Sequence, residues 1–71
     1  MKIMKDRFDT LLQKAQEGNA KSQYKLSKWL YKGYLVEKNH EAAKYWAFKA
    51  VSNGYNKAGL FFEKLDSITK L

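Results

Sequence analysis

Four lysines at helical spacing are the residues of this chain whose chemistry best suits a binding function. They follow one another at intervals of four, three and four residues, so on a helix they lie within roughly 60° of one another. This lysine stripe comprises Lys21, Lys25, Lys28 and Lys32. Tyr24 and Tyr31 lie one heptad apart beside it. Ammonium groups pair with carboxylates, and tyrosine rings add apolar contact and a phenolic donor. The pattern therefore favours an acidic ligand. The alternative interpretation is a solvated outer face with both tyrosines packed between helices.

The chain offers little of the chemistry that catalysis or metal binding requires. It has no cysteine, His40 is its only histidine, and no serine lies in a nucleophile-elbow or phosphate-loop context. Glu37 and Glu41 have helical spacing, but Lys38 and Lys44 lie nearby, so the pair is typical of surface charge. We expect a non-enzymatic protein without a cofactor or a metal, and a structural or solvated role for His40.

The charge balance also favours an acidic partner. Fourteen basic against seven acidic residues give a formal net charge of +7, which attracts acidic protein surfaces, nucleic acid or anionic membranes. Arg7 is the only arginine, and this disfavours nucleic acid, whose readers commonly use arginine. No apolar run approaches the ~18 residues of a membrane span, and no signal peptide is evident. We therefore expect a cytoplasmic protein.

The elements that must position these residues are four helices joined by short turns. The 71-residue chain lacks proline and is 45% hydrophobic, and its apolar residues recur at helical spacing. Helices are predicted over residues 5–17, 20–32, 39–52 and 56–66, with Asn39 as an N-cap. The expected fold is all-α, built from antiparallel hairpins. The predicted inner faces comprise Met4, Phe8, Leu11, Leu12 and Ala15; Ser22, Leu26, Trp29 and Leu30; Ala42, Ala43, Trp46 and Ala50; and Ala58, Phe61, Phe62 and Leu65.

A period of 36 residues separates two of the predicted stop signals, Gly18 and Gly54. A small residue follows each glycine by four positions, Ser22 in one case and Ala58 in the other. A period in this range indicates an array of stacked helical hairpins. The predicted organisation is a single domain over 1–71, with one full repeat at about 19–54 flanked by half-repeats at 4–18 and 55–71.

Several short segments between residues 11 and 65 together resemble a Sel1-like repeat, a relative of the tetratricopeptide repeat. They are Ser22 to Leu26, Leu30 to Gly33, Val36, Glu41 to Ala43, Tyr45-Trp46 and Lys49 to Gly54. The resemblance implies a right-handed α-α superhelix. Three residues depart from the family pattern: Ser22 where it prefers alanine, Ser27 where it prefers glycine, and Leu35 where a second loop glycine is usual. A branched side chain resists positive φ, so we expect the connector to differ at Leu35.

The resemblance also implies where a partner binds. In such repeats the first helix of each hairpin lines a concave groove, and the partner is another protein or peptide. The groove-facing positions in this chain are Lys21, Tyr24, Lys28, Tyr31, Lys32, Lys57, Leu60 and Lys64. Similar bacterial proteins serve as adaptors, regulators and binders of effectors. We therefore predict protein binding to an acidic peptide or surface; a small immunity-type inhibitor of a toxin or enzyme is the alternative.

A second predicted surface is apolar and lies at the carboxyl end of the chain. Phe61, Phe62 and Leu65 belong to a half-repeat whose following helix is absent from the sequence. Either Ile68 and Leu71 fold back over them, or the surface is left for a partner or for a second copy of the chain. Homo-oligomerisation through this helix is therefore a further expectation.

Overall fold

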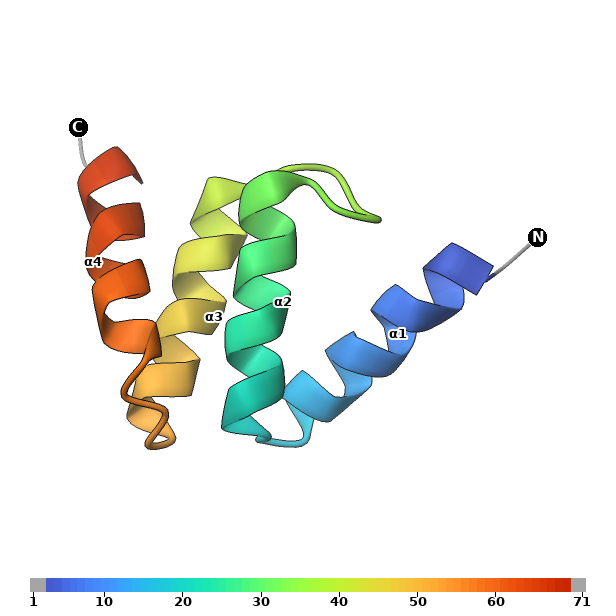
Figure 1. Cartoon of the computed structure of the whole chain (residues 1–71), viewed down its shortest axis with the longest axis horizontal. Coiled ribbons are helices and arrows are strands. Elements are labelled where there is room, and N and C mark those ends of the chain that lie inside the picture. Colours follow the sequence, from blue (N-terminus) through green and yellow to red (C-terminus); the bar gives the residue numbers. More distant parts are fainter. Residues whose placement is uncertain (1–2, 70–71) are drawn as a thin grey trace.

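The computed structural model describes residues 3–69, and the side chains from Arg7 onward; it contains four α-helices joined by turns (Figure 1). They are α1 (Ile3–Gln16), α2 (Ala20–Lys32), α3 (His40–Ser52) and α4 (Ala58–Thr69). Residues 3–69 contain no strand, so the predicted all-α fold is confirmed. No helix in this part of the chain is long and apolar enough to cross a membrane.

Two asparagines begin the central helices. The Asn39 Oδ1 accepts a hydrogen bond from the backbone N–H of Ala42 at 3.0 Å, which confirms the predicted cap of α3. The Asn19 Oδ1 accepts in the same way from Ser22 at 2.9 Å. Each bond satisfies one of the amides that a helix leaves unpaired in its first turn.

The connector between α2 and α3 contains two residues with positive φ. Gly33 ends α2 with φ 80° and donates its N–H to the Trp29 carbonyl at 2.8 Å. Leu35 follows with φ 62°, although this conformation costs a residue with a side chain about 1–2 kcal/mol. The connector is closed by the Asn39 N–H, which donates to the Leu30 carbonyl at 2.9 Å. Leu35 thus adopts the left-handed backbone that glycine would adopt more readily, instead of avoiding it.

The helices pack in sequence order, α1 on α2, α2 on α3 and α3 on α4, with Cα extents of 38 × 25 × 14 Å. α2 and α3 run antiparallel, whereas α1 diverges from α2 away from the turn that joins them (Figure 1). All four helices supply the buried core, which comprises Leu11, Ala15, Leu26, Leu30, Ala43, Ala47 and Leu65. The hairpin is tight because small residues meet there: the Ser27 Oγ donates to the Ala43 carbonyl at 2.6 Å.

The core differs from the predicted inner faces at several positions. Ala47 and Gln23 are fully buried but were not predicted, whereas Trp29 and Trp46 are half-buried against the core. The side chain of Met4 lies outside the described residues.

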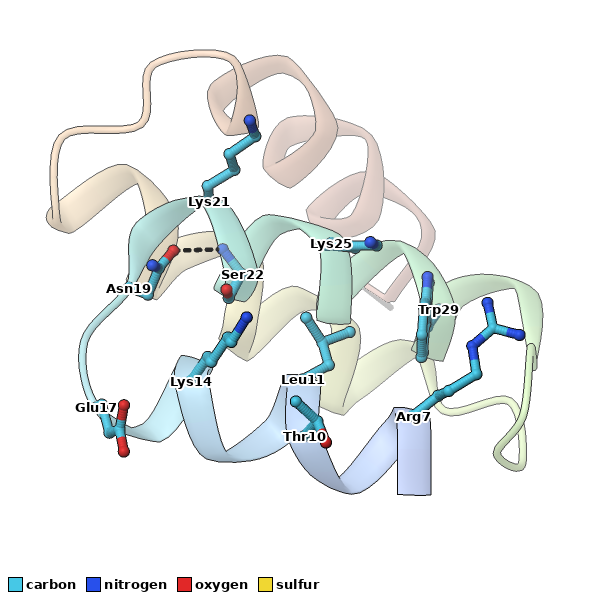
Figure 2. A pocket seen from close by; sticks show the side chains of 10 residues that line it. All are labelled: Arg7, Thr10, Leu11, Lys14, Glu17, Asn19, Lys21, Ser22, Lys25 and Trp29. Atoms are coloured by element: carbon cyan, nitrogen blue, oxygen red, sulfur yellow. Dashed lines mark hydrogen bonds between the residues drawn. The ribbon is translucent and has the colours of Figure 1, made fainter. Parts of the chain in front are cut away.

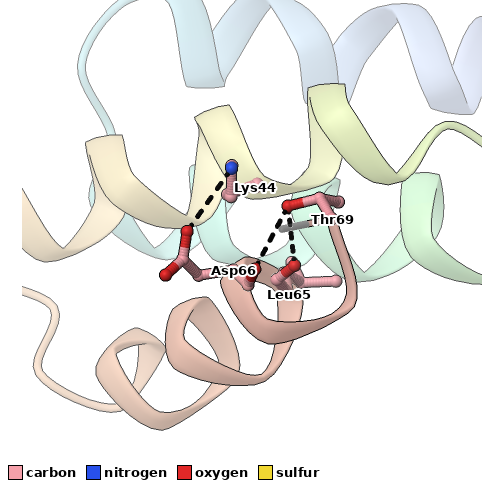
Figure 3. Close-up of polar contacts among 4 residues, drawn as sticks. All are labelled: Lys44, Leu65, Asp66 and Thr69. Carbon is pink, nitrogen blue, oxygen red and sulfur yellow. Dashed lines mark hydrogen bonds and ion pairs between the residues drawn. The ribbon is translucent and has the colours of Figure 1, made fainter. Parts of the chain in front are cut away.

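The last helix is fixed to α3 by a polar contact as well as by the core. The Lys44 Nζ lies 3.4 Å from the Asp66 Oδ1, and the Thr69 Oγ1 donates to the Leu65 carbonyl at 3.0 Å (Figure 3). Because Leu65 is fully buried, it cannot belong to the predicted apolar interface. Ile68 is exposed and thus does not fold back over its own helix, and Leu71 lies outside the described residues.

Candidate binding groove on α2

A cavity of about 380 Å³ runs along the exposed face of α2. We call it the α2 groove. The whole lysine stripe lines it together with four aromatic residues, and none of the lining residues is acidic. The lining residues are Lys21, Tyr24, Lys25, Lys28, Trp29, Lys32, Tyr34 and Tyr55.

The sequence of α2 explains why its lysines face outward. Ala20–Lys32 contains no acidic residue, and its buried side chains all lie on the opposite face of the helix. Those buried residues are Ser22, Gln23, Leu26, Ser27 and Leu30. Because one face of α2 packs against α1 and α3, the lysines between these buried residues lie on the opposite, outer face of the helix, as their spacing predicted.

An aromatic cluster fills the space between α2 and α4. The Tyr24 ring lies 5.2 Å from that of Tyr55 and 5.8 Å from that of Phe61. The Tyr31 ring meets Phe61 edge-on at 5.5 Å and stacks on His40 at 5.0 Å. Such pairs contribute about 0.5–1.5 kcal/mol each beyond their buried area. Both tyrosines therefore pack between helices, which was the alternative interpretation, but Tyr24 lines the groove as well.

Three lysine ammonium groups lie over aromatic rings, two of them on rings of this cluster and one on Trp29. The distances from Nζ to the ring centroid are 4.6 Å for Lys28 on Tyr24, 5.7 Å for Lys25 on Trp29 and 4.9 Å for Lys64 on Tyr31. Contacts of this kind are worth about 0.5–1 kcal/mol at exposed sites. These contacts keep the lysine ammonium groups close to the aromatic rings. One ligand can therefore contact both the charges and the rings.

No carboxylate within the described part of the chain neutralises the groove. The one ion pair there joins Lys44 on α3 to Asp66 on α4 and includes no lysine of the stripe. Lysine repels lysine along the stripe, so the groove carries a positive potential that an acidic ligand would relieve.

Half of the predicted groove residues line the cavity. Lys21, Tyr24, Lys28 and Lys32 do so. Tyr31 and Lys64 contact each other beside it, and they connect to it through Phe61 and Tyr24. Lys57, in the turn before α4, and Leu60, which is 79% exposed, are not among the lining residues.

Four lining residues were absent from the predicted groove set. Lys25 shares the spacing of the stripe and could have been included on that ground. Trp29 was assigned to the core, where only part of its side chain lies. Tyr34 and Tyr55 lie in connectors, where helical periodicity gives no indication of which way a side chain points.

The predicted apolar surface on α4 is smaller than expected. Phe61 belongs to the aromatic cluster, and the Phe62 ring packs 5.8 Å from that of Phe48 on α3. The exposed aromatic side chains of this region lie instead on α3, where Tyr45 is 53% and Phe48 54% exposed.

Comparison of the chain with protein-family models, with curated proteins and with solved structures gave no match. The resemblance to Sel1-like repeats therefore stays a prediction from the residues that carry it. Among the described residues, no group of three or more histidine, cysteine, aspartate and glutamate side chains is arranged to hold a metal ion.

Proposed function

We propose that this chain is a non-catalytic protein-interaction module of the Sel1-like kind, active in the cytoplasm, which binds an acidic peptide or protein surface in the α2 groove. The observation that carries the proposal is the composition of the groove wall. Four lysines and four aromatic residues line one cavity, without a carboxylate among them.

The dimensions of the stripe suit an extended peptide. Lys21 and Lys32 lie near the two ends of α2, and a rise of about 1.5 Å per residue separates them by roughly 16 Å along the axis. An extended chain advances about 3.3 Å per residue. A segment of about five or six residues therefore spans the groove, and its alternate side chains meet the lysines while the others meet the rings.

The absence of arginine from the groove lining favours a peptide over a nucleic acid. Lysine ammonium groups are point charges that accept a carboxylate in many orientations, whereas bidentate phosphate and base contacts rely on arginine. Only lysines supply the positive charge here. A carboxylate-rich peptide with interspersed apolar residues satisfies both parts of the wall.

Selection from a random peptide library tests the proposal without a known partner. We expect peptides selected on the wild-type chain to be enriched in Asp and Glu interspersed with apolar residues. The variant Lys28→Glu with Lys32→Glu should lose most of this enrichment, because a buried or partly desolvated charge pair at an interface contributes several kcal/mol.

The matched control is Lys38→Glu with Lys49→Glu. It lowers the net charge by the same amount as the groove variant. It also changes the same kinds of lysine: Lys49 lies over the Tyr45 ring at 5.9 Å, and Lys38 is exposed. The control should keep the enrichment, and circular dichroism should show both variants folded. Equal loss in both variants would mean that only net charge matters. A nucleic-acid function would appear instead as oligonucleotide binding whose affinity falls with salt at a slope near −0.9 per phosphate.

A further inference from the structure

A second and larger basic cavity lies between α1 and α2. Its volume is about 710 Å³, and residues of both helices line it (Figure 2). We call it the α1–α2 cleft. Four basic side chains line it, Arg7, Lys14, Lys21 and Lys25, against the single carboxylate of Glu17.

The placement of these charges within the cleft is uneven. Glu17 lies at the end where α1 turns into α2, whereas Arg7 lies at the other end beside Trp29, and Lys25 lies between these ends (Figure 2). Arg7 is the only arginine of the chain, and its planar guanidinium can bind a carboxylate through two parallel hydrogen bonds. Leu11 and Trp29 supply apolar lining between the charges. The cleft thus repeats the combination of cations and apolar surface found in the α2 groove.

The two cavities adjoin each other along α2. Lys21, Lys25 and Trp29 line both of them. The Trp29 side chain is half-buried, with the Lys25 ammonium over its ring and the Tyr34 ring edge-on at 5.0 Å. Trp29 therefore lies at the boundary between the two cavities and leaves both open. Lys21 and Lys25 line both cavities, so each can contact a ligand in either one.

We propose that a single acidic segment of a partner protein occupies both cavities, crossing α2 at Lys21 and Lys25 from the groove into the α1–α2 cleft. This inference rests on the proposed function and specifies the length of the partner segment. Arg7 and Glu17 lie ten positions apart on and beyond α1, about 15 Å along a helix axis. The cleft thus accommodates roughly five further extended residues, and the complete segment has about ten to twelve.

Peptides of two lengths test the inference. The probes are a six-residue and a twelve-residue peptide in which Glu and Leu alternate, with acetylated and amidated ends, titrated by fluorescence anisotropy. On the wild-type chain the longer peptide should bind at least about tenfold more tightly, because its second half binds as an intramolecular event. Arg7→Glu with Lys14→Glu, neither of which lines the groove, should reduce this advantage to about threefold or less. The Kd of the short peptide should stay within about twofold.

Two further variants make the result specific. Arg7→Gln with Lys14→Gln removes the two charges without reversing them, and it should also remove most of the tighter binding of the longer peptide. The control Lys38→Glu with Lys49→Glu should preserve that tighter binding. The inference is overturned if the longer peptide has no advantage on the wild-type chain, or keeps it in the cleft variants. If the short peptide fails to bind, or binds equally well to Lys28→Glu with Lys32→Glu, the proposed function itself is wrong.

Discussion

Gln23 shows how a single polar side chain can join three helices. It is 1% exposed. Its Nε2 donates to the Ala15 carbonyl of α1 at 2.9 Å, and its Oε1 accepts from the Asn53 Nδ2 after α3 at 3.0 Å. A buried amide needs such partners because leaving it unpaired costs about 1–3 kcal/mol. Gln23 therefore orients α1 and α3 relative to the helix that carries the groove.

Replacing this amide tests its role. We expect Gln23→Leu to lower the free energy of unfolding by about 1–3 kcal/mol, because the Ala15 carbonyl loses its partner in the buried interior and the bond to Asn53 is lost as well. For a chain of this size the melting temperature falls by roughly 4–8 °C per kcal/mol. Gln16→Leu, at an exposed site on α1, is the control and should change stability by no more than about 0.5 kcal/mol. Equal melting temperatures for the two variants would show that the Gln23 bonds contribute nothing.

Residue-level prediction from the sequence succeeded where the side chain has one dominant environment. The lysine stripe and the Asn39 cap follow directly from spacing and from cap chemistry. Gln23 lies three positions before Leu26, on the inner face, so spacing alone could have placed it in the core. A polar side chain is buried only where it finds partners, and the sequence does not show that Ala15 and Asn53 lie within reach of Gln23.

At the scale of elements, the α2–α3 hairpin depends on small residues at its contact. Ala43, Ala47 and Ala50 are fully buried on α3, and the bond from Ser27 to Ala43 brings the two backbones close. Packing of this kind leaves no room for a larger side chain. The hairpin therefore holds α2 in the position that exposes its lysine stripe.

A larger side chain at Ala50 should separate the hairpin. We predict that Ala50→Leu lowers the free energy of unfolding by about 1–3 kcal/mol through overpacking, because Ala50 is fully buried. Thermal melting of this variant beside Ser52→Leu, an exposed position on the same helix, measures the effect. An unchanged melting temperature for Ala50→Leu would mean that the site can enlarge freely and that Ala50 is not an interhelical contact.

Helix bounds were predictable wherever a residue marks them. Asn19, Gly33 and Asn39 coincide with the ends of α2 and α3, which the sequence placed within a residue. α4 begins at Ala58 instead of residue 56 and ends at Thr69 instead of residue 66. No glycine or proline follows it to mark an end, so the local signal was weak there.

At the scale of the whole molecule, six of the fourteen basic residues line the two cavities that flank α2. The lysine stripe serves the groove, and Arg7 and Lys14 extend the positive charge to the α1–α2 cleft. A concentration of like charge beside apolar surface raises the local density of an acidic partner and speeds its encounter. The sequence could predict the sign of this surface but not its extent, because the divergence of α1 from α2 is a property of the packed chain.

The competing surface is the outer face of α3. Tyr45 and Phe48 are both more than half exposed there, and Lys49 lies beside them. This face therefore also combines a positive charge with exposed aromatic surface, the same combination that an acidic peptide with apolar residues would contact in the groove. The location of binding therefore decides between the α2 groove and this face.

The most direct test of the groove is a map of amide chemical shifts in a nitrogen-labelled sample titrated with the six-residue Glu and Leu peptide. We predict that the largest changes fall on α2, centred on Tyr24, Lys28 and Lys32, with weaker changes at Tyr55. Saturation should occur with one Kd across these residues, since one ligand contacts them all. Changes centred instead on Tyr45 and Phe48, with α2 unaffected, would contradict the assignment of the groove as the binding site.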